Sequence, residues 1–140
     1  MTSIMGSGIR RREDPRLITG AATYTDDIKL PGLTYAAFLR SPYAHAKITK
    51  IDTSLAKAAP GVVAVYTGAD VNPHVLPVLC AWNPPNCDLK VPPHPVLAQD
   101  KVRYVGDAVA MVVAETRAQA RDAIDLIDVD YDTLPAEADP

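Results

Sequence analysis

The sequence predicts an α+β fold with a mixed and largely antiparallel sheet, one short helix and one longer helix. Several β-favouring segments are separated by turns of Gly, Pro and Asp, and one stretch near the C-terminus has the periodicity of an amphipathic helix. The 140 residues are 48% hydrophobic and 22% charged, which is typical of one globular domain. With one Phe and one Trp, the core must be built mainly from Val, Ile, Leu and Ala.

Residues 1–20 are expected to form an extended arm with little core of its own. They are polar and glycine-punctuated, and their basic residues are Arg10, Arg11, Arg12 and Arg16. Such an arm is expected to lie on a partner or on another domain. The domain itself is expected over residues 21–134, and residues 135–140 are expected to begin a linker.

Two strands are expected after the arm, over residues 33–40 and 46–51, with Ser41-Pro42 between them. The second alternates small or apolar residues with polar ones, so one of its faces should be in water. Ahead of both, residues 22–25 are short and β-favouring, and Asp26-Asp27 follows as a turn.

A short helix is expected over residues 54–59, because Asp52, Thr53 and Ser54 can cap its start and Pro60-Gly61 ends it. The segment after it, residues 62–67, is apolar nearly throughout and is expected to be a central strand.

The second half predicts two more strands, a helix and a last β segment. Residues 101–105 favour a strand, and Gly106 is expected in a bulge or tight turn before the apolar run 108–114. That run does not alternate, so it should be covered on both faces. A capping-box pattern then begins a helix over residues 116–127, whose apolar positions recur on one face, and β character resumes at residues 129–131.

Proline is the unusual component of the sequence. There are 13 prolines, and seven fall between Pro73 and Pro95. Because proline removes a backbone donor and disfavours helix at the preceding residue, no helix is expected to persist over residues 72–95. This proline-rich loop is long enough to be functional or disordered.

Charge and hydropathy exclude some classes of protein. The formal net charge is −3, so a nucleic-acid partner is disfavoured. No stretch approaches the roughly 20 apolar residues of a membrane helix, and residues 1–18 lack the apolar run of a signal peptide. We therefore expect a cytoplasmic protein with two free thiols, Cys80 and Cys87.

Few residues are candidates for chemistry. Ser41 and His45 are four residues apart, but a turn serine and a surface histidine are the simpler interpretation. A zinc site could draw on His74, Cys80, Cys87 and His94, although the intervals lack the tight spacing of a zinc knuckle. The acidic cluster near the C-terminus does not follow the calcium-loop pattern and favours a solvated face; it contains Asp122, Asp125, Asp128, Asp130 and Asp132.

Three segments occur in a specific order: Glu13-Asp14-Pro15-Arg16-Leu17-Ile18-Thr19-Gly20, Arg40-Ser41-Pro42-Tyr43-Ala44-His45-Ala46 and Val102-Arg103-Tyr104-Val105-Gly106-Asp107. Together they resemble the opening of the molybdopterin-binding large subunit of molybdenum hydroxylases, the family of xanthine dehydrogenase, aldehyde oxidase and aerobic carbon monoxide dehydrogenase. Cys80-Ala81-Trp82, followed by Pro84-Pro85, looks most like subunits of the carbon monoxide dehydrogenase type.

The resemblance implies an α/β hammerhead domain within an oxidoreductase that hydroxylates its substrate with oxygen from water. The catalytic and cofactor-contacting residues of the family lie in later domains, so no catalytic, cofactor-binding or metal-binding residue is assigned here. The complete subunit would hold molybdopterin, with iron–sulfur clusters and FAD in partner subunits or domains, and this chain alone should be inactive. The alternative is a stand-alone, non-catalytic interaction module or a split subunit.

The resemblance also implies that Val96 and Leu97, just before Ala98-Gln99-Asp100-Lys101-Val102, lie near the mouth of a substrate channel. The proline-rich loop would then shape an entrance, because a stiff loop loses little entropy when it is ordered. The other interpretation is an interface loop packed on the remaining domains. The basic arm, residues 10–16, is expected to dock on the iron–sulfur subunit.

Overall fold

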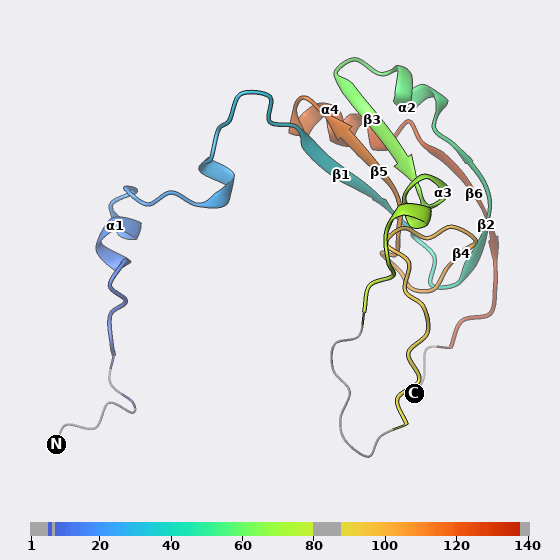
Figure 1. Cartoon of the computed structure of the whole chain (residues 1–140), viewed down its shortest axis with the longest axis horizontal. Coiled ribbons are helices and arrows are strands. Elements are labelled where there is room, and N and C mark those ends of the chain that lie inside the picture. Colours follow the sequence, from blue (N-terminus) through green and yellow to red (C-terminus); the bar gives the residue numbers. More distant parts are fainter. Residues whose placement is uncertain (1–5, 7, 80–87, 138–140) are drawn as a thin grey trace. The chain divides into compact units, whose positions relative to one another are not determined.

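Figure 1 shows the computed structural model of the chain, which describes residue 6, residues 8–79 and residues 88–137. The chain divides into two units, Met1–Leu33 and Thr34–Pro140. The first unit contains the helix α1, Asp14–Ile18, and a 3-10 turn, Thr25–Asp27.

The arm, expected to be extended with little core of its own, contains the short helix α1, in which no residue is buried. Pro15 occupies the first turn of α1, where its missing N–H is not needed, and the Asp14 carboxylate accepts from the Arg11 backbone N–H at 3.0 Å and from Arg11 Nε at 3.1 Å. The β-favouring residues 22–25 also form no strand. The Tyr24 backbone N–H instead donates to the Asp27 carboxylate at 2.9 Å, which fixes the 3-10 turn.

The second unit has the predicted α+β fold, with antiparallel pairing, but its strands form two three-stranded sheets rather than one. The first sheet has the order β1-β5-β3 and contains Tyr35–Arg40, Ala108–Ala114 and Val62–Thr67. The second has the order β4-β2-β6 and contains Lys101–Val102, Ala46–Asp52 and Asp128–Thr133.

Strand β5 is the central strand of the first sheet. Ala110 and Val112 are buried in the core on one of its faces, whereas Met111 and Val113 are only partly buried, so the expectation that the run 108–114 is covered on both faces was wrong in part. Strand β3 was expected to be central and is instead an edge strand, so its Val63 side chain is exposed. The predicted strand at residues 101–105 is limited to β4, because the chain turns at Gly106, whose φ of +91° suits glycine. The tight turn expected at Gly106 is confirmed.

Both predicted helices are present in the second unit. The short helix is α2, Ser54–Ala58, and the longer one is α4, Arg117–Ile124, with Thr116 as its N-cap. Two short elements follow β3 without a break: the helix α3, Gly68–Val71, and a 3-10 turn, Asn72–His74. The sequence interpretation missed α3 and this turn.

Two adjoining clusters of small aliphatic side chains form the core of the second unit. The first lies between the β1-β5-β3 sheet and the helices α2 and α4, and it contains Ala56, Val65, Ala110, Val112, Ala123 and Ile127. The second contains Ala46, Ala98, Val102 and Val109. Ile51 and Val129 pack against both clusters, so the two sheets share a continuous apolar interior.

Candidate functional site

The candidate site is the segment that follows the proline-rich loop, Val96 to Gln99, together with the elements that hold it. The structure places the two predicted channel residues differently. Leu97 is 1% exposed and belongs to the core, whereas Val96 is 39% exposed. Ala98 next to them is also buried, and its N–H donates to the Ala108 carbonyl at 2.7 Å. A channel role for Val96 and Leu97 stays a prediction.

Asn72 fastens this segment through its side-chain amide. Its Nδ2 donates to the Leu97 carbonyl at 2.9 Å, and its Oδ1 accepts from the Leu97 backbone N–H at 3.5 Å. The same Nδ2 also contacts Gln99 Oε1 at 3.4 Å. The Asn72 side chain therefore forms the hydrogen bonds of the Leu97 backbone N–H and C=O groups that a neighbouring strand would otherwise form.

Gly68 allows α3 to approach the segment closely. A Cβ atom on Gly68 would lie 2.9 Å from the Ala98 carbonyl oxygen and 3.0 Å from the Leu97 carbonyl oxygen. Since both contacts are with backbone atoms, no side-chain rotation could relieve them. The close packing of α3 against Leu97 and Ala98 thus depends on a residue without a side chain.

Asp70 fixes the start of α3. Its Oδ2 accepts from the Thr67 backbone N–H at 2.8 Å and from Thr67 Oγ1 at 2.7 Å. These hydrogen bonds, the backbone one first, hold the pKa of the Asp70 carboxyl below its ordinary value of 3.8. Asn72, Gly68 and Asp70 were all missed in the sequence, although Thr67-Gly68-Ala69-Asp70 is a capping-box pattern that could have indicated α3.

The low pKa of Asp70 predicts a pH-dependent effect of Asp70→Asn. A carboxyl group whose pKa is lower in the folded state than in the unfolded state stabilises the protein at pH values above its unfolded-state pKa. This stabilisation disappears as the pH falls through the folded-state pKa. The carboxylate is exposed to solvent, which screens it, so the variant should lose only a few tenths of a kcal/mol to about 1 kcal/mol near pH 7. Urea unfolding at pH 7 and below pH 3 measures the difference, which should shrink at the lower pH. Asp122→Asn is the control, and an equal loss at both pH values would contradict the capping role.

The two described arms of the proline-rich loop meet at its base. The Val78 backbone N–H donates to the His94 carbonyl at 2.8 Å, and the His94 ring stacks on Tyr104 with centroids 5.9 Å apart. Partial loss of water around the Tyr104 hydroxyl, followed by the negative charge of Asp107, raises the pKa of Tyr104. Beyond this base the arms carry exposed apolar side chains, including Leu79 at 78%, and they line a groove of about 340 Å³ with Val91 and Pro92 among its walls.

The structure does not bring Ser41 and His45 together as a catalytic pair. The buried Ser41 hydroxyl donates to the Tyr43 carbonyl at 2.9 Å and accepts from the Tyr43 N–H at 3.0 Å, as in an ordinary turn. His45 Nδ1 lies 2.7 Å from the Pro135 carbonyl, which accepts only, so this nitrogen carries the hydrogen. His45 Nε2 then accepts from Lys101 Nζ at 3.5 Å.

The alternative zinc site cannot be assembled from the residues described. Cys80 and Cys87 lie outside them, and His94 is engaged with Tyr104. Within residues 8–79 and 88–137, no three His, Cys, Asp or Glu side chains are grouped as metal ligands, the acidic cluster included. None of the helices in the described part has the length and apolar character needed to cross a membrane.

Among the described residues, every buried side-chain nitrogen or oxygen has a hydrogen-bond partner within the chain. The described structure therefore contains no orphaned buried polar group that would indicate a molybdopterin site.

Comparison with known proteins identifies the fold. Residues 19–135 match the family model described as aldehyde oxidase and xanthine dehydrogenase, a/b hammerhead domain. The chain is 43% identical to the nicotine 6-hydroxylase large subunit of Paenarthrobacter nicotinovorans, over 99% of this chain and 17% of that protein. It is 46% identical to the carbon monoxide dehydrogenase large chain of Afipia carboxidovorans, over 97% of this chain and 16% of that protein.

A solved structure agrees with these matches. Quinoline 2-oxidoreductase from Pseudomonas putida 86 superposes with a TM-score of 0.83 at 43% identity, over 93% of this chain and 16% of that chain. The chain belongs to the aldehyde oxidase and xanthine dehydrogenase family and has the fold of its hammerhead domain, which confirms the resemblance. It spans about a sixth of the length of these relatives, and their names as large subunits do not favour the stand-alone alternative.

Proposed function

We propose that this chain serves as the N-terminal domain of the molybdopterin-binding large subunit of a molybdenum hydroxylase. The observation that carries the proposal is its alignment, over nearly its whole length, with large subunits of enzymes named for nicotine hydroxylation and carbon monoxide oxidation. The complete enzyme would hydroxylate its substrate with oxygen from water, and the molybdenum cofactor, held by the remaining domains, would supply the redox chemistry. This chain would contribute structure, an interface and part of the substrate channel.

An apolar sheet face supports the interface role. Residues directly opposite each other in antiparallel strands share a face, so Phe38, Met111 and Tyr66 lie side by side across β1, β5 and β3. Phe38 is 42% exposed and Tyr66 is 39% exposed, and α4 covers the opposite face of the sheet. Exposed apolar patches of this kind mark surfaces that another domain or subunit covers. The remaining domains of the large subunit are the partner that we propose for this face.

For the channel we propose that Val96 lines the entrance and that the adjacent buried Leu97 holds it in position. Asn72 and Gly68 support this arrangement, because they fix the backbone at Leu97 through hydrogen bonding and close packing. A side chain at an entrance can discriminate among substrates only if its backbone is held in place. The exposed side chain of Val96 meets this requirement.

Three further assignments belong to the same proposal. Iron–sulfur clusters and FAD in partner subunits or domains would carry the electrons away from molybdenum. The basic arm, with Arg10, Arg12 and Arg16 beside the paired Arg11, would dock on the iron–sulfur subunit. The cytoplasm is the location that we propose.

The test uses the complete enzyme, carrying either Val96→Phe or the control Val63→Phe. Val63 is an exposed valine on the edge strand β3, away from the segment at Leu97. Activity is measured on carbon monoxide, nicotine, quinoline and xanthine. Val96→Phe places a larger side chain at the entrance, so kcat/KM for the bulkier compounds should fall by about 10-fold relative to kcat/KM for the smallest compound oxidised. The shape of a pocket commonly discriminates between substrates by a factor of this size. Val63→Phe should leave the ratio unchanged.

The outcomes separate the parts of the proposal. A complete protein that binds no molybdenum and copurifies with no iron–sulfur or flavin partner would contradict the enzyme assignment. A loaded, active enzyme whose substrate ratio does not respond to Val96→Phe would contradict the channel role alone. Deleting residues 1–16 from the same enzyme should reduce copurification of the iron–sulfur subunit, and unchanged stoichiometry would count against docking by the arm.

A further inference from the structure

The outer edge of β1 is an open strand edge. Strand β1 pairs with β5 on one side only, and no strand of the described chain pairs with its other side. Proteins usually block such edges with proline, bulges or covering segments. The sequence Tyr35–Arg40 contains no proline, and its register shift lies at the end of the strand, between Leu39 and Arg40. The backbone N–H and C=O groups on the outer edge of β1, before the register shift at Leu39, are therefore available to pair with a further strand.

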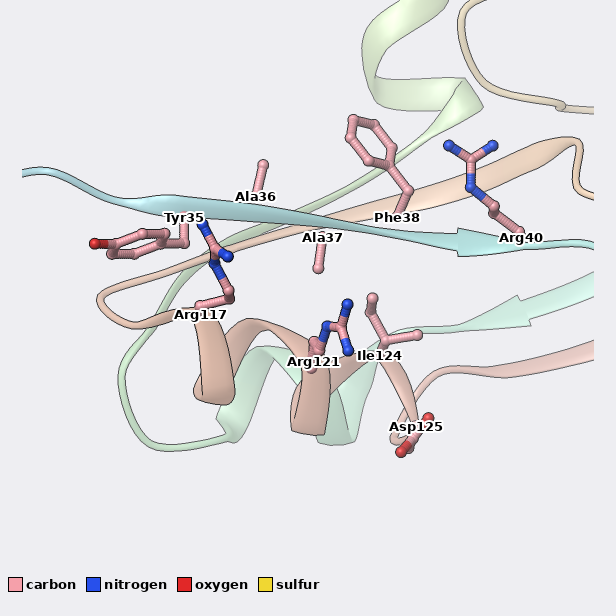
Figure 2. Close-up of a pocket in the computed structure, with 9 residues that line it drawn as sticks. All are labelled: Tyr35, Ala36, Ala37, Phe38, Arg40, Arg117, Arg121, Ile124 and Asp125. Carbon is pink, nitrogen blue, oxygen red and sulfur yellow. The ribbon is translucent and has the colours of Figure 1, made fainter. Parts of the chain in front are cut away.

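A groove of about 660 Å³ follows this edge (Figure 2). Five of the six residues of β1 line it: Tyr35, Ala36, Ala37, Phe38 and Arg40. Successive side chains of a strand point to opposite faces, and Figure 2 shows Ala36 and Phe38 on one side of β1 and Ala37 on the other. A depression lined by both sets must run along the edge of the strand, where the backbone is exposed.

One wall of the groove is basic. Arg117 and Arg121 of α4 extend towards β1, and the Arg117 guanidinium lies over the Tyr35 ring, 5.8 Å from its centroid. Arg40 stands at the far end, with its Nη1 donating to the Gly106 carbonyl at 2.8 Å. The lining contains three arginines and one aspartate, Asp125, so the groove is positive although the whole chain has a net charge of −3.

The spacing of this wall suits an extended chain. Figure 2 shows Arg117, Arg121 and Ile124 following one another beneath β1 in the direction from Tyr35 to Arg40. Residues four apart on a helix are separated by about 6 Å along its axis, and alternate residues of a strand by about 6.6 Å. Two acidic side chains at alternate positions of an added strand would thus stand opposite Arg117 and Arg121.

We propose that the outer edge of β1 binds an extended acidic segment of a partner polypeptide as a fourth strand of the sheet. Backbone hydrogen bonds to β1 provide the affinity, and acidic side chains facing Arg117 and Arg121 select the segment. This proposal rests on the geometry of β1 and α4 and holds whether or not the chain is part of a molybdenum enzyme.

The test titrates the 140-residue chain into a fluorescein-labelled seven-residue peptide in which Glu alternates with Val, and it follows fluorescence anisotropy. The control peptide carries Lys in place of Glu. Two further peptides are N-methylated, one at all Glu residues and the other at all Val residues, because alternate N–H groups of a strand point to the same edge. Strand addition requires that one methylated peptide lose binding and that the other retain it.

Variants of the chain test the basic wall. Arg117→Gln combined with Arg121→Gln should weaken binding of the acidic peptide by at least about 10-fold, since two charge-assisted contacts are removed. The control Arg103→Gln, outside the groove, should stay within about two-fold. Circular dichroism monitors folding, and the peptide controls decide the question even if the double variant does not fold. The proposal would be overturned if the Lys peptide bound as tightly as the Glu peptide, or if the two methylated peptides bound equally well. It would also be overturned if sedimentation showed that the chain self-associates and that a second copy occupies the edge.

Discussion

Leu97→Ala is expected to lower the free energy of unfolding by about 2–5 kcal/mol, the usual range for deleting a fully buried leucine side chain. Leu97 is 1% exposed, and the backbone around it is held by Asn72 and by the hydrogen bond from Ala98 to Ala108. Because these contacts restrain the segment, it cannot readily collapse into the space left by the side chain. The loss should therefore fall in the upper part of the range.

Leu76→Ala is the matched control for this prediction. The substitution is chemically the same, but Leu76 is 82% exposed on an arm of the proline-rich loop, so the expected change is within about 0.5 kcal/mol. Urea unfolding of the 140-residue chain, followed by circular dichroism, measures both variants. Equal stabilities of Leu97→Ala and Leu76→Ala would show that Leu97 does not belong to the core in solution.

Gly68→Ala is expected to cost about 1–3 kcal/mol, the range for forcing extra volume into a packed site. The new methyl group would press on the carbonyl oxygens of Leu97 and Ala98, so α3 or the segment would have to move. The higher helix propensity of alanine would offset up to about 1 kcal/mol of this cost. In the complete enzyme, the same displacement should change the substrate ratio that Val96→Phe tests.

Gly8→Ala is the control for the glycine substitution. A Cβ on Gly8 would meet no atom within 4 Å, and Gly8 does not have the positive φ that disfavours alanine. Its melting temperature should therefore equal that of the unchanged chain, whereas Gly68→Ala should melt several degrees lower. If Gly68→Ala melts at the unchanged temperature, the close approach of α3 to the segment does not exist in solution.

The elements with strong local signals could be predicted from the sequence. The helix α4 begins where Thr116 and Gln119 indicated, because the Thr116 hydroxyl accepts from the Gln119 N–H at 3.2 Å. The apolar run of β5 correctly predicted a strand, but only one of its faces is buried in the core: Met111 and Val113 on the other face are partly exposed. The edge position of β3 could not be obtained in this way, because its apolar residues reflect contacts with α2 and with the core rather than a second neighbouring strand.

The candidate site was harder to predict because its parts are distant in sequence. Asn72 bonds to Leu97, 25 residues away, and only the tertiary structure brings them together. The expectation that Leu97 lies near an entrance gave no indication that its side chain is buried. Its apolar neighbours Val96 and Ala98 are compatible with core structure, but the segment is too short, directly after Pro95, to show a periodic pattern that would predict burial.

The hydrogen bond between Val78 and His94 has a consequence for how relatives of this domain can diverge. It holds the two described arms of the proline-rich loop together at Val78 and His94, whatever sequence connects these two residues. Doubling the length of such a loop costs only about 0.6 kcal/mol in closure entropy. A change in the length of the chain between Val78 and His94 should therefore leave the register of the two sheets unchanged, as long as this hydrogen bond is kept.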